Sequence, residues 1–304
     1  MTPPSLLVAT GLAPGATVIL ALLSTLALAT GVVARPNGLG AHGALRAQVT
    51  SWWYLMPPVF LAWAVEPWGV PLLVLAISAL AARDLRGLVA AGRSHLLVAG
   101  LIVLVALQAL AMATGDALPG CLALLMIASA ALARWCNGGR RGRTSLLLAL
   151  FAAQAAGLLC LPVLAPLGPT DGTPADWFLY LCVVTALNDI GQFIAGTALG
   201  RHKLAARISP GKTWQGLGGG LVMSVGVSML VGGGLGLASL PALAALGAVL
   251  CLAGLLGDLL FSAGKRALGV KDFSHLIPGH GGVLDRVDSL VLTAPALLLA
   301  LRFL

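Results

Sequence analysis

The sequence predicts an all-α, polytopic membrane protein of about nine or ten transmembrane helices with a cytoplasm-facing polar site. Of its 304 residues, 59% are hydrophobic and only 9% are charged, and the mean hydropathy is +0.99. Soluble domains carry about a quarter charged residues, so that class is excluded. Continuous Leu/Ala/Val runs of about 20 residues favour helices over alternating strands, because backbone polar groups in lipid must be satisfied internally.

The apolar runs predict ten spans in order, and the second and third are short and interrupted by prolines. The alternative is that one or both of these two are re-entrant, which leaves nine crossings. The first run has neither an early positive segment nor a cleavage site, so we expect a retained helix rather than a signal peptide. The predicted spans are 6–33, 53–66, 68–83, 95–114, 118–134, 145–167, 176–199, 216–237, 241–263 and 286–303.

The basic residues follow the predicted topology. Of the 18 Lys and Arg residues, 17 fall in or beside alternate connections, and only Arg302 lies on the opposite side. This positive-inside pattern predicts an inner- or plasma-membrane protein whose basic connections face the cytoplasm. The net charge of +8 is therefore a topology signal, with anionic membrane lipids rather than nucleic acid as partners. The basic segments are 35–51, 83–94, 134–144, 201–213 and 264–286.

Polar chemistry is concentrated in the second half of the chain. We predict that residues 1–175 are a transmembrane scaffold for lipid access and dimer contacts, and that residues 176–304 form the catalytic region. The glycine-rich stretches at 216–220 and 231–236 predict close helix packing. Any site must therefore use helix ends and short connections in residues 176–304.

Two aspartates lie inside predicted spans of this catalytic region. A carboxylate in a membrane helix costs a few kcal/mol or more unless it is paired or coordinated, so Asp189 and Asp258 are candidate site residues. The alternative is a hydrogen bond to a neighbouring helix. At about 1.5 Å per residue, Asp258 lies about 10 Å from Lys265, and Asp189 lies about 18 Å from the next basic connection. One site can include both aspartates only under one of two conditions. Either the helix that carries Asp189 ends early, near Gly196 or Gly200, or a polar cavity enters the membrane.

The stretch "SPGKT" at 209–213 comes directly before a predicted helix. Backbone N–H groups at that helix start, with the side chains of Ser209, Lys212 and Thr213, would form an anion cradle. The stretch is not a Walker A loop, because Ala206 stands where that motif needs a glycine. The alternative is an ordinary polar turn.

The stretch "KDFSHLIPGHGGVLDRVD" at 271–288 combines glycine, acidic and basic residues. Asp285 and Asp288 are three residues apart and therefore share a helix face. Mg²⁺ takes one or two such carboxylates and completes its shell with water and substrate phosphates. The glycines let backbone approach a ligand, and the cations offset phosphate charge. The further candidates of this region are Lys265, Lys271, His280, Gly281, Gly282 and Arg286.

Residues 262–288, "SAGKRALGVKDFSHLIPGHGGVLDRVD", closely resemble the signature of the phosphatidate cytidylyltransferases, or CDP-diacylglycerol synthases. The shared pattern is Ser, Lys-Arg, Lys-Asp, Pro-x-His-Gly-Gly and Asp-Arg-x-Asp at fixed spacing. Residues 185–216 are similar to the upstream segments of the family. Three departures concern the substrate loop more than the metal site: Gly211 for a lysine, Gln215 for a glutamate and Gly264 for a large apolar residue.

The resemblance implies that CTP and phosphatidate react to CDP-diacylglycerol and pyrophosphate in phospholipid synthesis, and it suggests a homodimer. The implied catalytic residues are Asp258, Lys265, Asp285 and Asp288, and the implied Mg²⁺ ligands are Asp258 and Asp285, with Asp288 and Asp189 supporting them beside a second cation. The implied substrate-binding residues are Ser209, Lys212, Thr213, Lys271, His280, Gly281, Gly282 and Arg286.

Three alternatives remain at this point. A related CTP-dependent membrane enzyme would act on a polyprenol or on another lipid phosphate. An ion-coupled transporter would use Asp189 and Asp258 as an ion path, but such transporters carry broken helices in both halves, whereas polar residues here crowd one half. A non-catalytic paralogue is the third.

Overall fold

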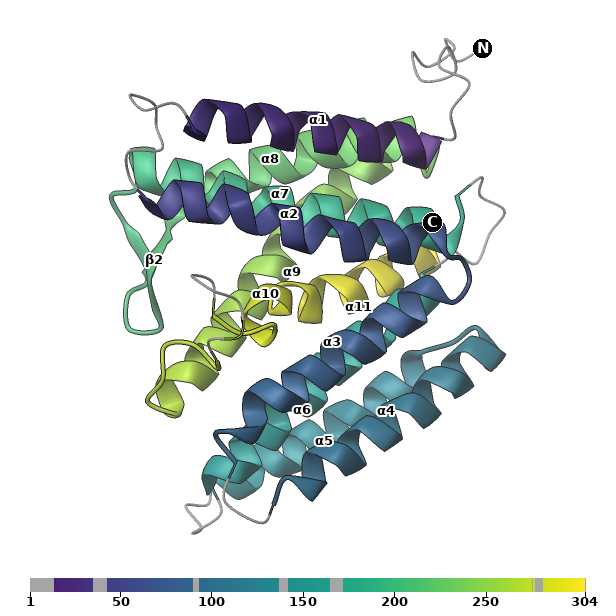
Figure 1. Cartoon of the computed structure of the whole chain (residues 1–304), viewed down its shortest axis with the longest axis vertical. Coiled ribbons are helices and arrows are strands. Elements are labelled where there is room, and N and C mark those ends of the chain that lie inside the picture. Colours follow the sequence, from purple (N-terminus) through teal and green to yellow (C-terminus); the bar gives the residue numbers. More distant parts are fainter. Residues whose placement is uncertain are drawn as a thin grey trace.

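A computed structural model describes residues 14–34, 43–89, 93–136, 142–164, 172–274, 276 and 281–303. It shows a bundle of long helices (Figure 1). Within the described residues, seven helices are long and apolar enough to cross a membrane. This confirms the predicted all-α, polytopic membrane class. The seven are α1 (Pro14–Ala34), α4 (His95–Thr114), α5 (Leu118–Cys136), α6 (Gly142–Leu159), α7 (Pro174–Leu199), α8 (Trp214–Gly234) and α9 (Leu240–Ala267).

The two proline-interrupted spans form helices outside this set of seven. Helix α2 (Gly43–Ala64) begins before the predicted start at residue 53 and contains Pro57 and Pro58. Helix α3 (Gly69–Arg86) is mostly apolar and ends in a charged turn that contains Arg83, Asp84 and Arg86. A turn of 3₁₀ helix (Leu161–Val163) follows α6.

The predicted last span, 286–303, is broken in the structure. It consists of α10 (Leu284–Val287), α11 (Leu290–Ala300) and a final 3₁₀ turn (Leu301–Phe303). At about 1.5 Å per residue, the 11 residues of α11 extend about 17 Å, which is shorter than the roughly 30 Å apolar core of a bilayer. The break leaves α10 free to orient its side chains independently of α11.

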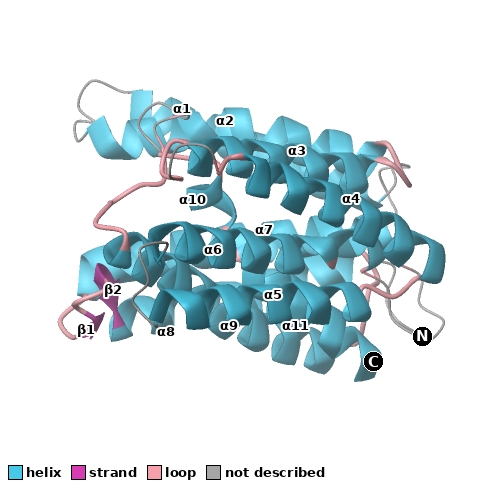
Figure 2. Cartoon of the chain, turned by 90° about the horizontal axis from the view of Figure 1, so that it is seen from below, coloured by secondary structure: helices cyan, strands magenta, loops and turns pink. Residues whose placement is uncertain are grey.

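The segment between α7 and α8 forms a β-hairpin that the sequence did not predict. Strands β1 (Lys203–Ala205) and β2 (Ser209–Thr213) pair antiparallel, at one end of the bundle (Figure 2). Gln215 closes the base of the hairpin, because its Oε1 accepts hydrogen bonds from the backbone N–H groups of Arg201 at 3.1 Å and His202 at 3.2 Å. A glutamate oxygen could accept these two bonds equally well, and the amide differs through its Nε2, which lies 3.0 Å from His202 Nδ1.

Helices α1, α2, α7 and α8 lie side by side, and α3 to α6 form a second group (Figure 1). A capping box starts α7: the Thr173 side chain accepts from the N–H of Asp176, and the Asp176 side chain accepts from the N–H of Thr173. Glycines allow α8 to approach α7, since a Cβ on Gly219 would lie 2.2 Å from the Cβ of Ala195. The predicted close packing at 216–220 is confirmed.

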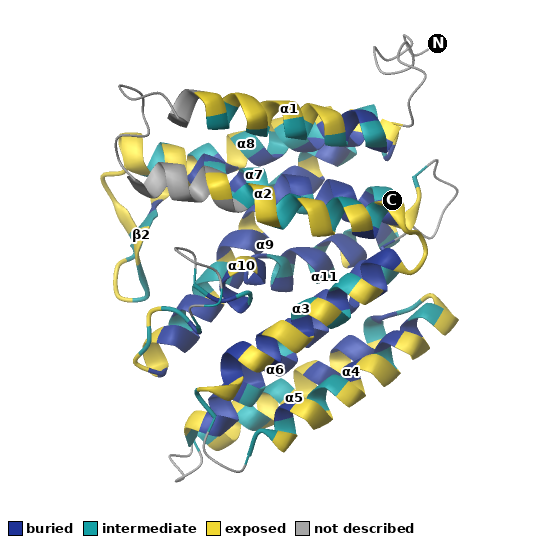
Figure 3. Cartoon of the chain, viewed as in Figure 1, coloured by how far each residue is buried: buried dark blue, intermediate teal, exposed yellow. Residues whose placement is uncertain are grey.

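The apolar core runs through both parts of the chain. The larger cluster of buried side chains contains Leu104 and Leu158 as well as Leu243 and Leu297. Exposed side chains in the described bundle include many large apolar residues on its outer faces (Figure 3), as expected where lipid is the solvent. The functional division of the chain at residue 175 stays a prediction.

Candidate active site

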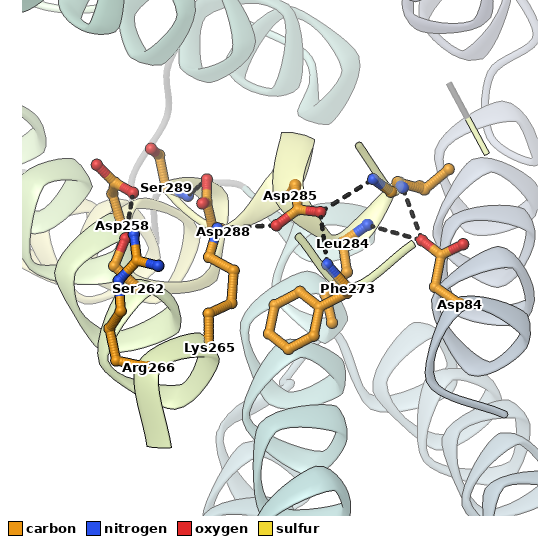
Figure 4. Close-up of polar contacts among 12 residues, drawn as sticks. Asp84, Asp258, Ser262, Lys265, Arg266, Phe273, Leu284, Asp285, Asp288 and Ser289 are labelled. Carbon is orange, nitrogen blue, oxygen red and sulfur yellow. Dashed lines mark hydrogen bonds and ion pairs between the residues drawn. The ribbon is translucent and has the colours of Figure 1, made fainter. Parts of the chain in front are cut away.

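Three donors hold Asp285, which lies on α10 with only 2% of its side chain exposed. Its Oδ1 accepts a hydrogen bond from Lys265 Nζ on α9 at 2.8 Å and forms an ion pair with it. Its Oδ2 accepts from the backbone N–H groups of Phe273 at 3.1 Å and Gly282 at 2.9 Å (Figure 4). Buried charges persist where they are paired and hydrogen-bonded. Asp285 thus ties α10 to α9 and to the loop that leads into α10. This loop, called the signature loop below, has the described residues 271–274, 276 and 281–283.

A second ion pair joins the β-hairpin to α9. Lys212 Nζ lies 2.9 Å from Asp258 Oδ2 and donates to Gln192 Oε1 at 3.0 Å. Ser262 Oγ donates to the other oxygen of Asp258 at 3.3 Å. Burial by itself lowers the pKa of Lys212, but the carboxylates of Asp258 and Asp189 raise it to a net value above the usual 10.5. Lys212 is therefore a charged ammonium at neutral pH.

Asp189 reaches the same region from α7. Its Oδ2 accepts a hydrogen bond from Ser289 Oγ at 3.0 Å, whereas its Oδ1 is buried and has no hydrogen-bond partner among the described residues. Helix α7 continues through Gly196 to Leu199. Of the two predicted end points, Gly196 is therefore wrong, whereas Gly200 is the residue that ends α7 as its C-cap. A cavity also extends to Asp189.

This cavity has a volume of about 420 Å³ and connects an apolar wall with a charged end. Helices α2, α3 and α7 supply the apolar wall. The charged end comes from α10, from Asp288 after it and from Asp189 of α7. A space lined in this way can accept a molecule with a charged head and an apolar body. The apolar wall includes Leu55, Val59, Leu73, Ile77, Leu80 and Phe178, and the charged end includes Asp189, Asp285, Arg286 and Asp288.

The other predicted residues differ in their surroundings. Asp288 is buried, and its Oδ1 accepts from the N–H of Ser289 at 2.9 Å. Thr213 is the N-cap of α8, and its side chain accepts from the N–H of Gly216 at 3.0 Å. The Thr213 hydroxyl oxygen therefore caps a helix, and the anion cradle predicted at this helix start stays a prediction.

Some predicted residues lie at the margin of the site or beyond it. Ser209 is half-buried on β2, Lys271 is exposed, and Arg286 is exposed at the cavity. Gly281 and Gly282 lie next to Asp285. His280 lies outside the described residues, so its predicted contact with phosphate stays a prediction.

The acidic residues match the ligand chemistry of Mg²⁺. All four predicted ligands offer carboxylate oxygens, and the Oδ1 of Asp189 is a buried oxygen without a partner in the described part of the chain. In that same part, no three His, Cys, Asp or Glu residues already gather as a metal cluster. Mg²⁺ needs only one or two carboxylates when substrate phosphates and water complete its shell. The donor set therefore fits Mg²⁺ with one or two carboxylate ligands and other oxygens in the rest of its shell.

One residue of the site was missed in the sequence. Asp84 lies on α3 and accepts hydrogen bonds from Ser274, Val283 and Leu284. In the sequence Asp84 stands between Arg83 and Arg86. A charged turn at the end of an apolar run is typical of residues that only fix the orientation of a membrane span. No local signal separates that role from a contact with residues about 190 positions later in the chain.

Comparison with known proteins places these features in context. Residues 46–304 match the model of the cytidylyltransferase family. An uncharacterized protein of Escherichia coli K12, YnbB, is 44% identical over 126 residues, which are 41% of this chain and 42% of that protein. The phosphatidate cytidylyltransferase of Haemophilus influenzae is 40% identical over 126 residues, 38% of this chain and 42% of that protein.

A longer match is to the phosphatidate cytidylyltransferase of Brucella suis, which is 37% identical over 214 residues, 68% of this chain and 72% of that protein. The shorter matches, by contrast, span about two fifths of the length of the E. coli and H. influenzae relatives.

Proposed function

This chain belongs to the cytidylyltransferase family, and from that premise we propose that it converts CTP and phosphatidate to CDP-diacylglycerol and pyrophosphate. Two of the relatives carry the name phosphatidate cytidylyltransferase, which supports phosphatidate over a polyprenol or another lipid phosphate as the acceptor. The proposed reaction is a nucleotidyl transfer at a membrane surface.

The cavity is the observation that carries this proposal. Its apolar wall on α2, α3 and α7 suits acyl chains. Its charged end, where Arg286 lies with three carboxylates, suits a phosphate once a bound cation offsets those carboxylates. Ligand sites are mostly apolar with a few polar groups that set orientation. A lipid phosphate bound here would place its headgroup beside the acidic residues and its chains away from them.

The chemistry requires positioning and charge stabilisation. An oxygen of the lipid phosphate forms a bond to the α-phosphorus of CTP, and the bond from that phosphorus to the β-phosphate bridging oxygen breaks, so that pyrophosphate leaves. The attacking phosphate is already an anion, so no general base is needed. Arg286 would hold the lipid phosphate. Lys212 and Lys265, now paired with Asp258 and Asp285, would exchange these partners for phosphate oxygens of the nucleotide.

The other predicted substrate residues complete this proposal. Ser209, Thr213 and Lys271 would lie on the nucleotide side, because the hairpin and the signature loop carry them. Gly281 and Gly282 would keep the loop backbone close to the site.

We further propose that the carboxylates of this site hold Mg²⁺. Asp258 and Asp285 would bind the ion, with Asp288 and Asp189 supporting it or a second cation. Bound Mg²⁺ would offset the charge that develops on the phosphate oxygens. The two lysines would then be released from the carboxylates and become available to the substrate.

The positive-inside distribution supports a site that opens to the cytoplasm. An integral membrane protein with this orientation would receive CTP from the cytoplasm and the lipid from the bilayer. The homodimer suggested by the family resemblance stays a prediction.

The test is transfer of label from CTP to lipid. The purified full chain would be incubated in detergent micelles with Mg²⁺ and CTP labelled at the α-phosphorus, with phosphatidate, a polyprenol or an ether-lipid phosphate as separate acceptors. We expect labelled lipid and pyrophosphate with phosphatidate. Label transfer only with another acceptor would overturn the choice of lipid, and no transfer with any acceptor would favour a transporter or a non-catalytic paralogue.

Two variants address the site itself. Asp285→Asn is expected to abolish turnover, and Arg286→Gln, at an exposed side chain, is expected to raise the KM for phosphatidate while the protein stays folded. Asp116→Asn serves as the matched control, because that carboxylate pairs with Arg302 away from the cavity. Wild-type turnover of Asp285→Asn at saturating Mg²⁺ would contradict the metal assignment.

A further inference from the structure

The feature that carries a further inference is Asp84, a carboxylate of α3 that is only 5% exposed. Its Oδ1 accepts a hydrogen bond from Ser274 Oγ at 2.7 Å, and its Oδ2 accepts from the backbone N–H groups of Val283 at 2.7 Å and Leu284 at 3.4 Å. Ser274 and Val283 belong to the signature loop, and Leu284 is the first residue of α10; Figure 4 shows the contact between Asp84 and Leu284. No Lys or Arg among the described residues forms an ion pair with Asp84. The buried charge is therefore directed at the loop.

The contacts of Asp84 supply what α10 lacks. The first N–H groups of a helix have no partner within the helix, and the residue before α10, Val283, provides no side-chain cap. A carboxylate from α3 takes that role. Because hydrogen bonds to a charged group are about twice as strong as neutral ones, Asp84 holds the start of α10, and with it the direction in which Asp285 and Arg286 point.

The two loop glycines are explained by this arrangement. A Cβ on Gly282 would lie 2.4 Å from Asp84 Oδ2. Gly281 has a φ of +79°, which side chains rarely adopt, and a Cβ there would lie 3.0 Å from Asp285 Oδ2. The glycine pair thus lets two carboxylates approach the same loop, Asp84 from α3 and Asp285 from α10.

We propose that Asp84 is a positioning residue for the transfer reaction: it holds the signature loop and α10 so that Asp285, Arg286 and Asp288 face the cavity. This inference rests on the proposed function. Helix α3, which carries Asp84, also contributes Leu73 and other residues to the apolar wall of the cavity. The scaffold half of the chain therefore shapes both ends of the site.

The experiment compares Asp84→Ala with Asp84→Asn, and Asp116→Asn is the control. Loss of a residue that orients ligands of a metal site typically costs 10- to 100-fold in activity or metal affinity. We expect Asp84→Ala to lower kcat by about 10- to 100-fold and to raise the half-saturating Mg²⁺ concentration by a similar factor. Asp84→Asn keeps one acceptor oxygen for the loop and should recover part of this loss. The control should equal wild type.

Backbone hydrogen exchange gives a second readout that needs no turnover. In Asp84→Ala we expect about tenfold or faster exchange of the amides of Val283 and Leu284, since loss of their acceptor opens them locally, while amides in α6 and α8 exchange as in wild type. Faster exchange with unchanged kcat and Mg²⁺ dependence would overturn the positioning role and leave a purely structural one. Unchanged exchange would overturn the contact itself. If wild type transfers no label, the proposed function fails, and the exchange result still decides whether Asp84 holds the loop.

Discussion

The two lysine–aspartate ion pairs of the site differ in burial, and this difference predicts different costs of breaking them. The side chains of Lys265 and Asp285 are 11% and 2% exposed, whereas those of Lys212 and Asp258 are 19% and 20% exposed. Removal of one partner from a buried pair leaves an uncompensated charge and costs about 3–5 kcal/mol. Pairs in contact with water are worth about 0–1 kcal/mol.

We therefore expect Lys265→Met to lower the free energy of unfolding by about 3 kcal/mol, the low end of that range, because two backbone N–H groups still bond Asp285. For Lys212→Met we expect a loss of about 1 kcal/mol. Both values can be measured by reversible unfolding with sodium dodecyl sulfate in mixed micelles, without any assay of turnover.

A double variant separates loss of the pair from loss of lysine packing. In Lys265→Met with Asp285→Asn neither partner carries a charge, so the unpaired buried carboxylate is absent. We expect this protein to be more stable than Lys265→Met alone by about 1 kcal/mol or more. Equal losses for the two single lysine variants, or no recovery in the double variant, would refute the reasoning that burial sets the strength of these pairs.

Three further predictions concern packing, capping and metal. Gly157→Ala should lower the free energy of unfolding by about 1–3 kcal/mol, because the added Cβ would lie 2.3 Å from the Val291 carbonyl oxygen. The control is Gly226→Ala, whose Cβ meets open space; it should be neutral or stabilising by up to about 1 kcal/mol. Thr213→Val should lose about 1 kcal/mol by removing the cap of α8, and Thr213→Ser should keep it; similar stabilities for the two variants would contradict the capping role. Asp258→Asn should raise the half-saturating Mg²⁺ concentration for CTP turnover by about tenfold or more, and a chelator should abolish wild-type turnover; an unchanged Mg²⁺ dependence would remove Asp258 from the metal site.

Local patterns predicted much of the bundle correctly. The span 95–114 coincides with α4, because a continuous apolar run of that length has few stable forms in lipid other than a helix. The last span was predicted less well, since the predicted run 286–303 joined the charged helix α10 (Leu284–Val287) to the apolar helix α11 (Leu290–Ala300) as one crossing. The break at Asp288 depends on contacts that hydropathy does not report.

The sequence also singled out Asp189, Asp258, Asp285 and Asp288, though not Asp84, because a carboxylate beside an apolar run has a high cost and needs a reason. Their partners were not predicted. Lys212 was predicted to hold phosphate, and in the structure it pairs with Asp258 across the β-hairpin. That pairing depends on the β-hairpin, whereas "SPGKT" was predicted to be an anion cradle, with a polar turn as the alternative, and not a β-strand.

The sequence by itself determined that this protein is a helical membrane protein, and it predicted that the polar chemistry lies in residues 176–304, since length, hydropathy and motif spacing are properties of the chain alone. Only the tertiary structure decided that a residue of the first half, Asp84 on α3, binds the signature loop of the second half. Asp84 accepts a hydrogen bond from Val283, 199 positions later in the sequence. Its neighbours in the chain are arginines of the kind that end many membrane spans. A hydrogen bond depends on where two atoms lie in space, and packing of α3 against α10 sets that distance.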